Sequence, residues 1–358
     1  MDDLFIDYLI NKMSLKEKIG QLLYIDYRKT NEKIIGMTND FEKILNEYKP
    51  GGFILFNSNI SDFNNTKKFI KDIQSINGNN MFIGIDQEGG SVQRLGSNVG
   101  FKKIPAASLI NDKEEAYLLG KEVGTELFSI GVNMNMAPVM DIWSNIKNIV
   151  MMNRTYGSDP YEVSEKALSF AKGLKEVKII PVVKHFPGHG STNVNSHIDL
   201  PMLYKTKEEL YNLELIPFIA AIKEKISCIM VGHILLSKLD KYPASTSEVI
   251  VDKLLRKELG YNGIVMTDSL KMKALTKYYT DYEISYRCIK AGNDCILMPN
   301  DIRISFNAIY NAVNDGKISI NRIDNSLRRI LSLKLEMGLL DKEYLLYIKQ
   351  RNVLKKHL

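Results

Sequence analysis

The chain has 358 residues, of which 45% are hydrophobic and 25% are charged, the composition of a soluble globular protein with a large core. The net charge of +6 is spread along the sequence, and the one dense basic cluster, 349–357, is typical of a solvated helix end, so nucleic-acid binding has little support. Three cysteines without CxxC spacing indicate reduced thiols, two of them in apolar runs.

The first residues carry no targeting signal. Met1-Asp2-Asp3-Leu4 is acidic and leads into an amphipathic helix, without the cationic start and apolar core of a signal peptide. No apolar run reaches membrane-spanning length. We therefore expect a cytoplasmic monomer with no membrane partner.

Short apolar runs rich in β-forming residues alternate with helical patterns along the chain. We expect strands near 21–27, 52–57, 81–86, 133–141, 179–184, 227–233, 263–268 and 294–298. Apolar positions at three- and four-residue spacing predict helices over 62–76, 113–130, 159–177, 205–225, 248–260, 281–291 and 301–315. Because such alternation implies parallel pairing through crossovers, eight strands favour a single (β/α)₈ barrel of the TIM type, an α/β fold.

No linker or low-complexity segment divides the chain. Residues 1–340 are predicted to form the barrel catalytic domain, with a final helix near 320–337 packed under the barrel. Residues 341–358 are predicted to be a short basic tail, too small for a second domain.

Polar side chains close most of the predicted strands. They are Asn57, Asp86, Asp141, Lys184 with His185, His233 and Asp268. Because active sites in such barrels lie at the C-terminal ends of the strands, these groups should converge on one mouth.

Three of the five histidines lie between residues 184 and 197, after the apolar run 179–183. Pro187, Gly188 and Gly190 exclude the helix that would present His185 and His189 as metal ligands on one face. No cysteine lies nearby, so acid/base or sugar-binding roles are favoured over a metal site.

Two carboxylates have alternative interpretations. Asp268 ends an apolar strand, where it could cap the next helix or attack an anomeric carbon as a nucleophile. Asp86 could bind sugar hydroxyls together with Arg94, or the two could form an ion pair that only pins a loop. Arg154, in Asn-Arg-Thr-Tyr-Gly, supplies another cation.

These segments resemble glycoside hydrolase family 3, in particular its β-N-acetylglucosaminidase branch. The resemblance extends from Gly51 to Asn300. It rests on Asp-Gln-Glu-Gly-Gly, Lys-His-Phe-Pro-Gly-His-Gly and Met-Thr-Asp-Ser-Leu, which occur in the order expected for that family. It implies that Asp268 is the nucleophile and that His197 is the general acid/base. It also implies that the sugar is bound by Asp86, Arg94, Arg154, Lys184 and His185, and His233 at a neighbouring strand end is included as a further binding residue. No metal or organic cofactor is implied.

The chain departs from the family pattern at two positions. The usual Asp-Ser-His triplet reads Asn195-Ser196-His197, so the acid/base histidine has a neutral partner, which favours its protonated form less. Ser91 replaces the arginine usual in Gly-Gly-Arg-Val-Gln-Arg. These changes bear on the turnover rate and on the exact substrate.

The resemblance predicts a retaining exo-hydrolase that removes β-linked N-acetylglucosamine from small glycans such as recycled peptidoglycan fragments. One alternative is a phosphorylase that uses the same nucleophile. A second is a catalytically weakened barrel that binds muropeptides or chitobiose as a sensor.

Overall fold

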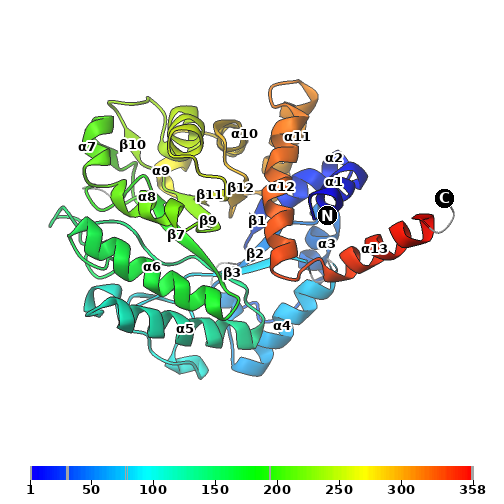
Figure 1. The fold of residues 1–358 in the computed structure, drawn as a ribbon, viewed down its shortest axis with the longest axis horizontal. Coiled ribbons are helices and arrows are strands. Elements are labelled where there is room, and N and C mark those ends of the chain that lie inside the picture. Colours follow the sequence, from blue (N-terminus) through cyan, green and yellow to red (C-terminus); the bar gives the residue numbers. More distant parts are fainter. Residues whose placement is uncertain (1, 30–31, 77, 79, 193–194, 356–358) are drawn as a thin grey trace.

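The computed structural model of the protein describes residues 2–29, 32–76, 78, 80–192 and 195–355. At its centre, eight parallel strands close into a barrel in the order β1-β12-β11-β9-β7-β6-β3-β2 (Figure 1). They are β1 (Leu23–Ile25), β2 (Gly52–Leu55), β3 (Phe82–Ile85), β6 (Met134–Asn135), β7 (Ile180–Phe186), β9 (Cys228–Val231), β11 (Ile264–Ser269) and β12 (Cys295–Leu297). The predicted (β/α)₈ barrel is confirmed, and all eight strands lie where the sequence predicts them.

Helices surround the barrel (Figure 1). They are α1 (Asp2–Lys12), α2 (Leu15–Gln21), α3 (Asn39–Tyr48), α4 (Phe63–Ile76), α5 (Lys113–Ile130), α6 (Pro160–Glu176), α7 (Lys207–Tyr211), α8 (Ile216–Lys223), the π-helix η5 (Val249–Glu258), α9 (Lys273–Thr276), α10 (Asp281–Ala291), α11 (Ile302–Asn314), α12 (Ile320–Glu336) and α13 (Asp341–Lys355). None of the helices among the described residues is both long enough and apolar enough to cross a membrane.

Local sequence signals set the helix boundaries. Asp159 accepts hydrogen bonds from the first amides of α6, and Pro160 occupies the first turn, where no amide partner is needed. α5 ends at Gly131, whose φ of 93° lies in the left-handed region that glycine adopts without strain. β7 is buried along its whole length, as a strand covered by helices must be.

Several elements differ from the prediction, including α2 and α9, which no predicted helix covers. Residues 205–225 form two helices rather than one, because Pro217 cannot continue a helix and lies in the first turn of α8. The segment 133–141 keeps only a short strand, β6, because Pro138 has no amide to donate to the ladder. α3, which begins after the cap Thr38, was not among the predicted helices.

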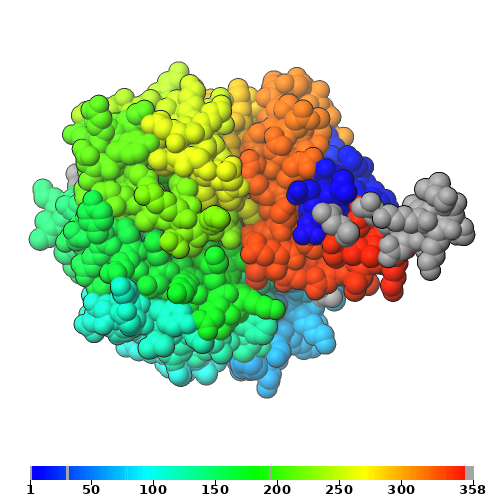
Figure 2. Space-filling view, viewed as in Figure 1, coloured from blue at the N-terminus to red at the C-terminus, as the bar shows by residue number. Residues whose placement is uncertain are grey.

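The chain ends meet on one side of the barrel. In the space-filling view, the N-terminal residues (blue) lie beside the C-terminal ones (orange to red) on one side of the molecule (Figure 2). α12 lies beside α1 and α2 at the position predicted for the final helix (Figure 1). The tail forms the helix α13 and extends away from the barrel, with Phe5 of α1 packed against Tyr344 and Tyr347. The end of the predicted basic tail, residues 356–358, lies outside the described residues.

Two small sheets lie in the loops beyond the barrel. The hairpin β4 (Gln87–Gly89) and β5 (Val92–Gln93) follows β3, and β8 (Met202–Leu203) pairs with β10 (Leu235–Leu236). The β4–β5 hairpin forms one wall of the candidate site.

Candidate active site

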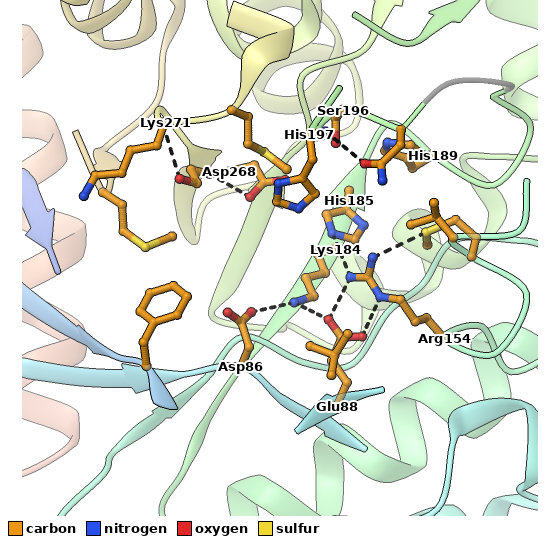
Figure 3. Close-up of a pocket in the computed structure, with 18 of the residues that line it drawn as sticks. Asp86, Glu88, Arg154, Lys184, His185, His189, Ser196, His197, Asp268 and Lys271 are labelled. Carbon is orange, nitrogen blue, oxygen red and sulfur yellow. Dashed lines mark hydrogen bonds and ion pairs between the residues drawn. The ribbon is translucent and has the colours of Figure 1, made fainter. Parts of the chain in front are cut away.

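A cavity of about 280 Å³ lies at the C-terminal ends of the barrel strands, where the sequence predicts the active site (Figure 3). This volume is close to the lower end of the range for small-molecule sites. The cavity is lined by every predicted site residue except His233, namely Asp86, Arg94, Arg154, Lys184, His185, Asn195, His197 and Asp268. The barrel thus brings together side chains that are far apart in the sequence.

A network of ion pairs forms the floor of the cavity. Lys184 Nζ lies 3.0 Å from Asp86 Oδ1 and 2.6 Å from Glu88 Oε1. Arg94 Nη2 lies 3.2 Å from Asp86 Oδ2, and Arg154 donates through Nε and Nη2 to both Glu88 oxygens, each at 2.8 Å. Burial alone would raise the pKa of Asp86, but Lys184 and Arg94 outweigh it and hold that pKa well below its usual range. The floor therefore stays ionised at neutral pH.

This floor suits a polyol. Asp86 can accept hydrogen bonds from hydroxyl groups while Lys184 and Arg94 donate to others. Asp86 and Arg94 form the expected ion pair and both also line the cavity, and sugar binding by the two stays a prediction.

Glu88 was missed by the sequence analysis. Its carboxylate is buried between Arg154 and Lys184, which overcome the cost of burial and lower its pKa to about 2. The available signal was the spacing in Asp86-Gln87-Glu88, because alternate residues of an extended segment point to the same side. Glu88 holds the two cations in place, so it orients the groups that face the cavity.

The β4–β5 turn shapes the wall that carries Arg94. The Gln87 side chain accepts hydrogen bonds from the Arg94 and Leu95 amides, at 2.9 and 3.0 Å. Gly89 and Gly90 have φ values of 101° and 57°, which most other residues adopt only with strain. Ser91 follows them and is exposed.

His185 is oriented by a second residue that was not predicted as a site residue. Its Nδ1 lies 2.6 Å from Asp141 Oδ2, and its Nε2 lies 3.5 Å from Arg154 Nη2. Burial would raise the pKa of Asp141, but His185 opposes this and the pKa is lowered. Asp141 was recognised only as a polar residue at a strand end.

His189 supports the loop from beneath. Its amide donates to Asp141 Oδ1 at 2.6 Å, and its Nδ1 lies 2.9 Å from the Thr192 hydroxyl. Burial lowers its pKa to about 4, so the ring is neutral at physiological pH. Of the described residues, no three His, Cys, Asp or Glu side chains are placed to hold a metal ion together.

Asp268 ends β11 with its carboxylate at the cavity. Oδ1 accepts a hydrogen bond from the Ser269 amide at 2.7 Å. Burial would raise the Asp268 pKa, but His185 and this amide oppose burial and the pKa is lowered. The carboxylate is thus an anion at neutral pH, as a nucleophile must be.

The structure places His233, which was predicted to bind sugar, outside the cavity. The ring is fully buried and is not part of the cavity wall. Its two nitrogens lie 2.7 Å from the Ser245 hydroxyl and 2.9 Å from the Ser269 carbonyl oxygen. His233 therefore positions the backbone that follows Asp268. Its place at a strand end in the sequence does not reveal whether the ring faces the core or the cavity.

His197 lies beside Asp268 at the mouth of the cavity (Figure 3). It is an exposed residue on the loop that follows β7. Asn195 Oδ1 accepts a hydrogen bond from the His197 backbone amide at 2.9 Å, so Asn195 contacts the backbone at this position rather than the ring. The loop therefore places the His197 imidazole beside the Asp268 carboxylate. Asn195, which is neutral, gives the imidazole no charged partner.

A cationic rim was also missed. Arg28 and Lys271 line the cavity, and both pair with the buried carboxylate of Asp26, at 2.5 and 2.7 Å. The Arg28 guanidinium lies 3.7 Å from the centre of the Phe56 ring. The position of Asp26 directly after the first strand was the available sign of a site residue. The sequence gives no sign that it pairs with Lys271, which lies 245 residues further along the chain, as well as with Arg28, two residues away.

Comparison with known proteins agrees with this geometry. Residues 14–333 match the model of the glycosyl hydrolase family 3 N-terminal domain. A β-hexosaminidase of Actinobacillus pleuropneumoniae serotype 5b (strain L20) is 33% identical over 268 residues, covering 72% of this chain and 76% of the relative. Beta-hexosaminidase A of Pseudoalteromonas piscicida is 28% identical over 368 residues, covering 91% of this chain.

A solved structure shows the same fold. The glycoside hydrolase family 3 β-N-acetylglucosaminidase from Paenibacillus sp. str. FPU-7 has a TM-score of 0.86 and 35% identity over 91% of this chain. The chain spans 63% of that protein and 62% of the Pseudoalteromonas relative. The family match covers most of the chain and includes the cavity, and the chain therefore belongs to glycoside hydrolase family 3.

Proposed function

We propose that the protein is a retaining exo-β-N-acetylglucosaminidase that removes N-acetylglucosamine from the non-reducing end of small glycans. One observation carries the proposal: an ionised Asp268 and the imidazole of His197 share a cavity whose floor is built to bind hydroxyl groups. The names of the related β-hexosaminidase and β-N-acetylglucosaminidase refer to the same sugar class.

The reaction takes two steps. First, an Asp268 oxygen bonds to the anomeric carbon while the glycosidic C–O bond breaks, and His197 donates a proton to the departing oxygen. Then His197 takes a proton from water, the water oxygen bonds to the anomeric carbon, and the Asp268 ester bond breaks. The two inversions give net retention, and the scheme needs no cofactor.

The test is a panel of aryl glycosides, assayed with the unmodified protein and with Asp268→Asn, which keeps the size of the side chain. We expect release of the aryl group from the N-acetyl-β-glucosaminide, a fall of at least about a thousandfold in Asp268→Asn, and a β-configured first product by NMR. An α-configured first product, or undiminished turnover by the variant, would refute the proposal.

A phosphorylase is the second candidate. It is favoured by the neutral Asn195 beside His197, because a neutral side chain repels phosphate less than a carboxylate would, and by the cations Arg28 and Lys271 at the rim, which attract phosphate. The same panel in phosphate and in phosphate-free buffer separates the two, since only a phosphorylase forms the sugar 1-phosphate.

A sensor is the remaining alternative. Tight binding of chitobiose with no turnover of any glycoside would favour it over both enzymes. A peptidoglycan origin of the substrate, a cytoplasmic location and a monomeric state stay predictions.

A further inference from the structure

The loop that carries His197 is tied to the segment that follows Asp268. Asp199 Oδ2 lies 2.8 Å from Lys277 Nζ, and Asp199 Oδ1 accepts a hydrogen bond from the Tyr278 hydroxyl at 2.6 Å. The carbonyl oxygen of Ser196, next to His197, accepts a hydrogen bond from the Ala274 amide at 3.1 Å.

Each of the two connected loops is close in sequence to one of the two reacting side chains, His197 or Asp268. Asp199 is two residues after His197 on the loop that follows β7. Lys277 and Tyr278 are nine and ten residues after Asp268, on the loop that follows β11. A tie between these two loops fixes the imidazole relative to the carboxylate, which neither loop could do alone.

We infer that Asp199, Lys277 and Tyr278 form a clasp that holds His197 over Asp268, and that these three are positioning residues for the proton-transfer steps. This inference rests on the proposed function and names the residues on which its acid/base group depends.

The clasp supplies what Asn195 does not. An acidic partner would orient the imidazole through charge, but Asn195 is neutral and its oxygen is bonded to the His197 backbone amide. The position of the ring therefore depends on the position of the loop. Effective proton transfer requires that position to be held within hydrogen-bonding reach of the leaving oxygen.

The clasp is weak enough to open. The side chains of Asp199 and Lys277 are 41% and 42% exposed, and exposed ion pairs of this kind shift an equilibrium only several-fold. The root of the loop is held more firmly, because the buried Glu214 carboxylate bonds both the Ser191 hydroxyl and the Lys205 ammonium. Among the described residues of the loop, the end that carries His197 is thus held by contacts that solvent can replace, which suits a loop that must release a leaving group.

A merely structural role would affect all substrates alike, whereas a positioning role depends on the leaving group. A dinitrophenolate departs without a proton, but the sugar leaving group of N,N′-diacetylchitobiose needs one. We therefore compare kcat/KM for 2,4-dinitrophenyl N-acetyl-β-glucosaminide and for diacetylchitobiose in the variants Asp199→Asn, Lys277→Met and Tyr278→Phe.

Each variant should lose about three- to fivefold in kcat/KM on diacetylchitobiose and less than about twofold on the dinitrophenyl substrate. Lys277→Arg should recover most of the loss, because it keeps the charge. With the dinitrophenyl substrate, any fall in kcat should be restored by azide, a nucleophile that needs no base. The control is Asp315→Asn, which removes an exposed pair of the same kind, Lys317–Asp315 at 2.8 Å, and should leave both substrates unaffected.

Equal losses on both substrates, or no loss on diacetylchitobiose, would overturn the clasp while the unmodified protein still turns over. Failure of the unmodified protein to cleave either glycoside would instead remove the proposed function, and the clasp with it. Thermal unfolding of each variant is measured alongside, and an unchanged Tm with the selective loss supports the inference.

Discussion

The Nδ1 atom of His185 lies 2.6 Å from Oδ2 of Asp141, and both side chains are buried. This contact joins β7 to the segment after β6 and directs the other ring nitrogen of His185 towards Arg154. The other carboxylate oxygen, Oδ1, accepts a hydrogen bond from the His189 amide. One carboxylate thus orients an imidazole and anchors the loop that leads to His197.

Asp141→Asn should impair both stability and activity. An amide offers one acceptor oxygen, whereas the carboxylate uses both, so one donor in this buried site loses its partner. We expect the free energy of unfolding to fall by about 1–3 kcal/mol, measured by urea denaturation, and kcat/KM to fall at least about tenfold. Asp315→Asn, an exposed position, should change neither. An unaffected kcat/KM would show that the orientation of His185 is unimportant.

Glu88 should make stability depend on acid pH. Its pKa is about 2 in the folded protein against 4.5 for a free side chain, so its contribution is fully present above about pH 5 and is lost as pH falls towards 2. This shift corresponds to about 3 kcal/mol. The difference in unfolding free energy between the protein and Glu88→Gln should therefore shrink between pH 6 and pH 3, by urea titration. Glu114→Gln, exposed on α5, should show no such trend.

Lys334 should weaken the fold near neutral pH. It is fully buried on α12, bonds Gln21 Oε1 at 2.6 Å, and burial lowers its pKa to about 7. Because the unfolded lysine keeps its proton up to about pH 10.5, folding is penalised most at and below pH 7, and stability rises from pH 7 to 10. Lys334→Met should add roughly 1–3 kcal/mol at pH 7, and this gain should narrow by pH 10.

Lys166→Met is the matched control for Lys334. Lys166 is also buried, but it pairs with Glu162 at 2.6 Å and donates to the Ile110 carbonyl oxygen. Its loss should destabilise the protein, because it leaves those partners unpaired. The prediction for Lys334 would be contradicted if Lys334→Met were less stable than the unmodified protein and its free energy of unfolding changed with pH in the same way.

Asn195→Asp should raise hydrolysis. The aspartate keeps an oxygen for the His197 amide and adds a negative charge beside the imidazole, which favours the protonated ring. We expect kcat/KM on diacetylchitobiose to rise several-fold and the alkaline limb of its pH profile to move to higher pH. Asn195→Ala, which loses the backbone contact as well, should be less active than the unmodified protein. An unchanged pH profile would show that position 195 does not tune the acid.

The sequence predicted the fold well because its signals are local. Apolar runs such as 179–183 and helix caps such as Asp159 depend on neighbours in the chain, and all eight strands followed from them. The differences lie at Pro138, which shortens a strand, at Pro217, which divides a helix, and at α2, α3 and α9, which no predicted helix covers. The predicted site residues at the strand ends, apart from His233, converged because a closed parallel barrel gathers its carboxyl ends.

The sequence by itself determined the barrel, the family and which strand ends carry chemistry, since periodicity and short motifs are written in consecutive residues. Only the tertiary structure decided the partners: Glu88 beneath Lys184, Asp141 behind His185, and His233 turned into the core rather than the cavity. The physical reason is that ion pairs and hydrogen bonds act over a few ångströms in space. The distances between these side chains depend on how the β-strands pack side by side, not on the separation of the residues along the chain.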